Sequence, residues 1–162
     1  MTGSAPETAP GDSPAARARK APRATTRASG VLAAIGHRWP TGLGIALAVA
    51  TFVDGVPPST SLAGILVAMP VCYLVFGALR GELRRPGVLA LQTAGLLGFG
   101  GLALLALSVD ADLCRYLLAA GWLAHAVWDF AHHRNGRVVP RAWAEGCGVV
   151  DLLGAASILL LA

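Results

Sequence analysis

The sequence predicts an all-α integral membrane protein, a bundle of five transmembrane helices with the N-terminus in the cytoplasm and the C-terminus outside. Three observations lead to this prediction. Hydrophobic residues make up 55% of the 162 residues and charged residues only 14%, whereas about a quarter of the residues of a soluble domain are charged. Five apolar runs follow one another, and most reach the roughly 20 residues that a spanning helix needs. The basic residues gather on one side when successive runs alternate in direction.

The start of the chain, residues 1–38, predicts a disordered basic tail. It is rich in Ala, Pro, Ser, Thr and Arg, and it carries six of the 13 Lys and Arg residues. Such a segment buries too little apolar surface to offset the entropy lost on ordering. We interpret it as a topogenic tail at the membrane surface. A transit peptide is the alternative, because those are also rich in Arg and Ser and poor in acidic residues.

The membrane domain is expected at residues 39–162. The first run is the shortest, and an earlier start near residue 30 is the alternative for it. Pro70 in the second run predicts a kink, and the many Gly residues are expected to let helix backbones approach closely. The five spans are predicted at approximately 40–56, 59–79, 87–109, 112–131 and 143–162.

The charge distribution tests the number of spans. With five spans, the tail and the loops at 80–87 and 134–141 fall on one side, which then holds twelve of the 13 Lys and Arg residues. This segregation is typical of a cytoplasmic side, and losing one span would place the two loops on opposite sides. The Ala, Gly and Arg bias favours a bacterial inner membrane, so we expect a multi-pass protein of the cell membrane. The outer side holds one basic residue among three acidic ones: Asp54, Asp110, Asp112 and Arg115.

A polar centre is predicted where the fourth and fifth spans meet. In the stretch HAVWDFAHH, which begins at His125, the spacing i, i+4 and i+7 places His125, Asp129 and His132 on one side of a helix. If the helix ends near His133, Asp129 lies about 6 Å and His125 about 12 Å inside the span. Asp151 enters the fifth span to a similar depth. Because a short loop makes the two helices adjacent and antiparallel, these side chains are expected to converge inside the bundle.

Four interpretations of this centre stay open. The charges could only fasten helices together, since an intramembrane charge must be paired. They could form a proton path, or His125 could ligate haem. They could also bind a divalent metal such as zinc or iron, and the candidate metal ligands are then His125, Asp129, His132 and Asp151. Tyr73 and Gln92 lie in the same inner half of the second and third runs.

An enzymatic function would be that of a membrane-embedded hydrolase acting on lipid, either metal-dependent or using a His/Asp pair. Its candidate catalytic residues are His125, Asp129 and Asp151. Basic side chains near a membrane surface attract anionic lipid, and the candidate residues for the lipid head group are Arg134, Arg137 and Arg141. The expected partners are the lipid bilayer and anionic lipid. Nucleic acid is excluded, because the basic residues lie in a tail and loops without stacking aromatics.

The stretch 121–160 resembles a pattern of small bacterial multi-pass membrane proteins whose function is unknown. The matching parts are an HxxWDxxHH box, a VVPR loop and an Asp in the next helix. The resemblance covers about a quarter of the chain and implies that these elements occur together. The matching positions are His125, Trp128, Asp129, His132, His133, Arg141 and Asp151.

Overall fold

Helices account for every regular element in the part of the chain that the structure describes. It is a computed structural model, and it describes residue 36 and residues 38–161. The predicted tail therefore lies outside the described residues, apart from Gly36 and Arg38. The all-helical prediction is confirmed for the described residues. Their elements are α3 (Trp39–Phe52), α4 (Ser59–Leu79), the 3-10 helix η1 (Glu82–Arg84), α5 (Val88–Leu107), α6 (Ala111–Asn135) and α7 (Arg141–Leu160).

Three of these helices, α4, α5 and α7, are long and apolar enough to cross a membrane. The helix α3 has 14 residues, which corresponds to about 21 Å at 1.5 Å per residue and is less than the roughly 30 Å of a bilayer core. The helix α6 has 25 residues and interleaves ionisable residues, among them Arg115 and Asp129, with its apolar ones. The chain thus has three helices of spanning length and composition among the described residues.

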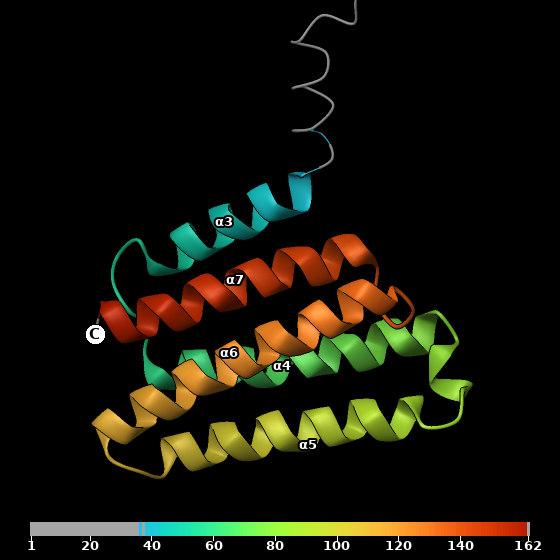
Figure 1. Ribbon diagram of the computed structural model, residues 1–162. Helices are drawn as coiled ribbons and strands as arrows, with labels where there is room; N and C mark the ends of the chain where they lie inside the picture. Colours follow the sequence, from blue (N-terminus) through green and yellow to red (C-terminus); the bar gives the residue numbers. More distant parts are fainter. Residues whose placement is uncertain (1–35, 37, 162) are drawn as a thin grey trace, which may run out of the picture. The chain divides into compact units, whose positions relative to one another are not determined.

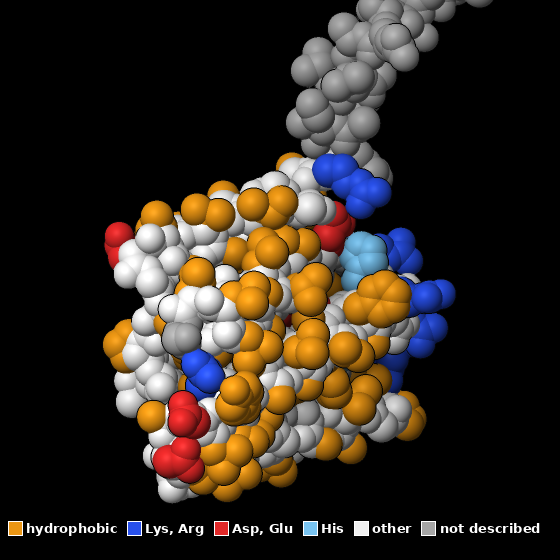
Figure 2. Space-filling view, turned by 60° about the vertical axis from the view of Figure 1, so that its left-hand side comes forward, with side chains coloured by type: hydrophobic (Ala, Val, Ile, Leu, Met, Phe, Trp, Pro, Cys, Tyr) orange, Lys and Arg blue, Asp and Glu red, His pale blue; other side chains and the backbone are white. Residues whose placement is uncertain are grey.

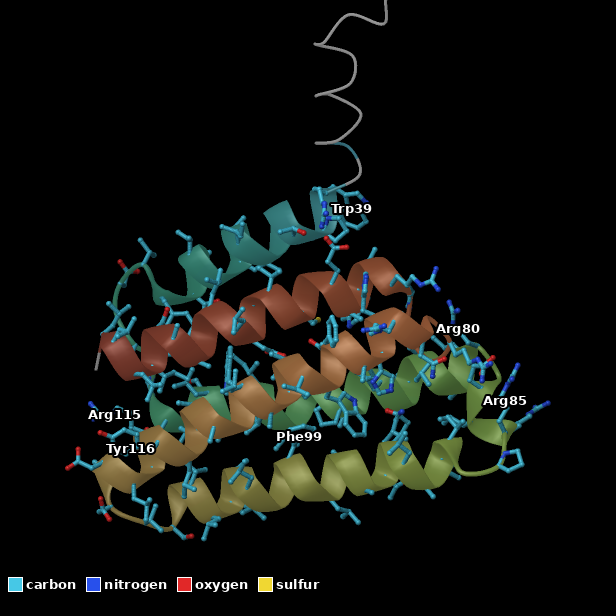
Figure 3. The ribbon with its side chains drawn as sticks, viewed as in Figure 1. Trp39, Arg80, Arg85, Phe99, Arg115 and Tyr116 are labelled. Carbon is cyan, nitrogen blue, oxygen red and sulfur yellow. The ribbon has the colours of Figure 1, made fainter. Side chains whose placement is uncertain are left out.

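The helices from residue 38 onwards lie side by side, and successive helices run in opposite directions (Figure 1). The helix α6 packs against α4, α5 and α7, whereas α3 packs against α7. Figure 3 shows Arg80 and Arg85 at one end of the bundle and Arg115 and Tyr116 at the other. The central position of α6 means that its polar residues face neighbouring helices on several sides.

The ends of α6 follow from local signals in the sequence. Asp110 caps its start, because the side chain accepts a hydrogen bond from the backbone N of Leu113 at 3.1 Å. Gly136 ends the helix with a left-handed backbone, φ 63°, a conformation that glycine adopts without strain. The helix therefore runs to Asn135, past the predicted end of the fourth span at 131, and includes His132 and His133, the second of which was the expected end of the helix. The short connection from Gly136 to α7 makes α6 and α7 antiparallel neighbours.

Small residues allow α7 to approach its neighbours closely. A Cβ atom at Gly44 of α3 would lie 2.6 Å from the carbonyl oxygen of Gly146 in α7. A Cβ atom at Gly154 would overlap the ring of Trp122, which is buried in the main apolar core. These glycines are therefore required by packing, as is usual where membrane helices are in close contact.

Candidate functional site

The structure brings together three of the residues that the sequence singled out. His125 and Asp129 of α6 and Asp151 of α7 are all fully buried. The Nδ1 atom of His125 lies 2.7 Å from Oδ2 of Asp151 and 3.6 Å from Oδ1 of Asp129. One potential ligand atom from each residue lies within 4.8 Å of the other two. We refer to these three residues as the His/Asp centre.

Two features of the helices assemble this centre. The spacing i, i+4 stacks His125 and Asp129 on one face of α6. Gly148 of α7 faces Asp129, and a Cβ atom at this position would lie 3.3 Å from the Cβ atom of Asp129. The absent side chain lets the α7 backbone approach and brings Asp151, one turn further along, beside His125.

Aromatic side chains from α4 and α5 enclose the centre. Tyr73 of α4 is buried, and its hydroxyl donates a hydrogen bond to Oδ1 of Asp129. Its ring lies edge-on to that of His125, with centroids 5.8 Å apart. The ring centroids of Phe99 from α5 and of His125 lie 4.9 Å apart. Figure 3 shows Phe99 between α5 and α6. The centre is thus surrounded by apolar and aromatic groups that compensate charge poorly.

His132 forms a separate buried pair with Gln92 of α5. Its Nδ1 atom lies 2.9 Å from the carbonyl oxygen of Trp128, and its Nε2 atom lies 2.9 Å from the amide nitrogen of Gln92. The backbone carbonyl can only accept, so Nδ1 of His132 carries a proton and donates it to Trp128, and Nε2 is left for the side-chain amide of Gln92. Both ring nitrogens are therefore occupied, and His132 does not join the His/Asp centre.

The charges within the His/Asp centre need compensation. His125 can supply at most one positive charge against two carboxyl groups, and no arginine forms an ion pair with either carboxyl group among the described residues. Each residue of the His/Asp centre also has one polar atom that finds no hydrogen-bond partner among the described residues. These atoms are His125 Nε2, Asp129 Oδ2 and Asp151 Oδ1. Leaving a buried charge uncompensated costs several kcal/mol, so protons or a cation must neutralise the centre.

The three loop arginines lie at the end of the bundle where α6 and α7 connect. Arg134 is exposed and lies over the ring of Phe130, 5.5 Å from its centroid. Arg141 packs against Gly136, and its carbonyl oxygen lies 3.0 Å from Nδ1 of His133. The backbone carbonyl of Arg137 accepts a hydrogen bond of 2.8 Å from Arg80, which links the two basic loops.

The sequence did not indicate the partners of Tyr73 and Gln92. The available signal was a polar residue in each of two apolar runs, at a depth similar to that of the His/Asp centre. Their partners depend on how α4 and α5 rotate about their axes, which nearly uniform apolar runs do not specify.

The fold and the site together define an all-helical protein with three helices of spanning length and a buried His/Asp centre. Comparisons of the chain with protein-family models, with curated proteins and with solved structures find no match. The geometry of the chain itself is therefore the basis for a functional proposal, and the resemblance in its C-terminal part stays a prediction.

Proposed function

We propose that the chain is a multi-pass integral membrane protein of the cell membrane with five spans, its N-terminus in the cytoplasm and its C-terminus outside. Large apolar side chains cover its outer surface, for example Leu97, Leu104 and Leu160, which are 70%, 73% and 81% exposed. Lipid would cover these side chains, whereas water would not solvate them well. The hydrogen bond from Arg80 to Arg137 supports a topology in which both basic loops lie on one side.

We further propose that the His/Asp centre binds one divalent metal ion through His125, Asp129 and Asp151. The observation that carries this proposal is the convergence of three fully buried side chains, with one potential ligand atom of each within 4.8 Å of the other two. Each side chain also has a second polar atom without a partner among the described residues. Imidazole nitrogen and carboxylate oxygen are common ligands of zinc and iron. A divalent ion with two carboxylates and a neutral imidazole leaves the centre without net charge, which an apolar bundle requires.

The distances fit such a site. Tetrahedral ligands about 2.1 Å from a zinc ion lie about 3.4 Å from one another. The Nδ1 atom of His125 is 2.7 Å from Oδ2 of Asp151 and 3.6 Å from Oδ1 of Asp129, and binding of an ion by these atoms would replace the hydrogen bond between His125 and Asp151. Three protein ligands would leave one coordination position for water, as in catalytic zinc sites. A lipid hydrolase is the enzyme class that such a centre would serve.

Metal analysis of the purified protein tests the proposal. Wild-type protein prepared without chelator should contain about one divalent transition-metal ion per chain. His125→Ala and Asp151→Asn should lose it, because each removes a ligand, whereas His133→Ala should retain it. The metal should also be released as the pH is lowered, since protons compete for the ligand atoms. Wild-type protein without stoichiometric metal, or His125→Ala with the full amount, would contradict the proposal.

A fastening role is the second candidate, and the distribution of the buried hydrogen bonds favours it. Asp129 is joined to Tyr73 of α4, His132 to Gln92 of α5, and His125 to Asp151 of α7. Each bond joins α6 to a different helix. If fastening is the function, Asp129→Asn and Asp151→Asn should each destabilise the metal-free protein in detergent by about 2 kcal/mol, the usual contribution of a hydrogen bond to a charged group. Unchanged thermal stability in both variants would exclude this role.

A further inference from the structure

A groove lies on the surface where α3, α6 and α7 meet. Its volume is about 580 Å³, within the range of roughly 300–1,000 Å³ that is common for ligand sites. Most of its lining is apolar, from Leu123, Val127 and Phe130 of α6 and from Val149 and Leu152 of α7. The remaining lining residues are small or polar, and the polar ones gather at one end: Arg38, Thr41, His133 and Glu145.

The groove exists because small residues line its floor. The helix α3 packs against α7 through Gly44 and Gly146, while Ala126 of α6 and Gly148 of α7 leave space between the larger side chains. Gly148 also lies against Asp129 on its inner side. Gly148 therefore both lines the groove and lies beside the His/Asp centre.

The length of the groove corresponds to one leaflet of a bilayer. Its α6 lining runs from Leu123 to His133, which is about 15 Å at 1.5 Å per residue and half of the roughly 30 Å hydrocarbon core. The polar end is the end at which the basic loops lie. Figure 2 shows acidic, basic and histidine side chains gathered there, beside a broad hydrophobic surface.

The charge at the polar end favours an anionic head group. Arg38 lines the groove, and Arg134 lies over the ring of Phe130, which also lines it. The carboxylate of Glu145 is engaged by the hydroxyl of Thr41. The polar end thus has one arginine in its lining and a second over a lining ring, against one carboxylate that already accepts a hydrogen bond, and cations near a membrane surface attract anionic lipid.

We propose that this groove binds one acyl chain of an anionic phospholipid from the cytoplasmic leaflet, with the lipid phosphate against Arg38 and Arg134. The proposal rests on the membrane placement proposed above and is independent of the metal. It retains Arg134 from the head-group residues expected from the sequence and adds Arg38. Arg141 instead packs against Gly136, and Arg137 contributes its backbone carbonyl to Arg80.

Native mass spectrometry of the full chain in detergent tests the groove, with phosphatidylglycerol and phosphatidylcholine added in equal amounts. Wild-type protein should retain one phosphatidylglycerol per chain in preference to phosphatidylcholine. Ala126→Phe should lower the retained fraction about tenfold, equivalent to about 1.4 kcal/mol of binding free energy, because the new ring fills the groove. Ala90→Phe, on the exposed face of α5, is the matched control and should bind as wild type does. Equal lipid retention by Ala126→Phe and wild type would overturn the proposal.

A second set of variants tests the head-group contact. Combining Arg38→Gln with Arg134→Gln should remove the preference for phosphatidylglycerol while phosphatidylcholine is still retained. Arg84→Gln lies in the other basic loop and should leave the preference unchanged. A preference that survives the double substitution would overturn the assignment of the phosphate. Membrane fractionation is done first: a chain in the soluble fraction contradicts the membrane placement, whereas a membrane-embedded wild type that retains no lipid contradicts the groove alone.

Discussion

The hydroxyl of Tyr73 is the only hydrogen-bond donor from α4 to the His/Asp centre among the described residues. It donates to Oδ1 of Asp129, and both side chains are at most 1% exposed. A hydrogen bond to a charged, buried acceptor contributes more than one at the surface, because water cannot replace the lost donor. Tyr73 and His125 are therefore the two side chains described near Asp129 that can compensate its charge.

Tyr73→Phe should lower the free energy of unfolding by about 2 kcal/mol, the usual contribution of a hydrogen bond to a charged group. The ring remains, so its packing against His125 and His132 is kept. Thermal unfolding in detergent measures the effect. Tyr116→Phe is the matched control: this residue is 54% exposed, and its substitution should change stability by less than about 0.5 kcal/mol. Equal stabilities of the two variants would show that the hydroxyl of Tyr73 contributes nothing.

The sequence predicted part of this site because helical spacing is a local property. His125 and Asp129 belong to one helix, so the i, i+4 spacing alone places them together. Asp151 follows from its depth in the adjacent antiparallel helix. The pairing of His132 with Gln92 could not be predicted, because the spacing of His132 matches that of a ligand equally well. Only the packing of α5 against α6 turns it toward Gln92.

The contact between α3 and α7 depends on two glycines. A Cβ atom at Gly44 would lie 2.6 Å from the carbonyl oxygen of Gly146 and 3.0 Å from the Cβ atom of Val149. One of these neighbours is backbone, so it cannot move without shifting a helix. The backbone of α3 at Gly44 therefore lies too close to α7 for any larger residue at this position.

Gly44→Ala should destabilise the protein by about 1–3 kcal/mol, the usual cost of overpacking. Gly42→Ala is the control in the same helix, because a Cβ atom at Gly42 would have no neighbour within 4 Å. It should leave the stability unchanged or raise it slightly, since Ala favours helix over Gly by about 1 kcal/mol. Thermal unfolding of the two variants distinguishes them. A Gly44→Ala protein as stable as Gly42→Ala would contradict the close approach.

Hydropathy predicts the helices themselves better than their packing. Apolar runs of about 20 residues indicate α4, α5 and α7 because the length required by a bilayer is long and distinctive. The sequence predicts the end of the fourth span at about residue 131 and the end of its helix near His133, because apolar residues stop there. Gly136, with its left-handed backbone, is the signal that sets the end, and it lies beyond both positions.

At the scale of the whole molecule, charge and apolar surface are arranged along the same axis. The basic loops lie at one end, where Arg80 bonds to the loop between α6 and α7. Asp110 and Asp112 lie at the opposite end, at the start of α6. Because the loops before α5 and before α7 share one end, α5 and α6 must either both cross the membrane or both remain on one side. The exposed face of α5 is apolar and includes Leu97 and Leu104. This face favours an arrangement in which both helices cross the membrane.

Single cysteines in the loops test this topology. The three native cysteines, Cys72, Cys114 and Cys147, are first replaced by alanine. A membrane-impermeant maleimide should then label Asp54→Cys and Asp112→Cys in intact cells, but Arg84→Cys and Arg137→Cys only after permeabilisation. The physical reason is that basic loops stay on the cytoplasmic side, where they need not be translocated. Labelling of Arg84→Cys and Arg137→Cys from opposite sides would mean that α5 or α6 does not cross, and the chain would then have fewer than five spans.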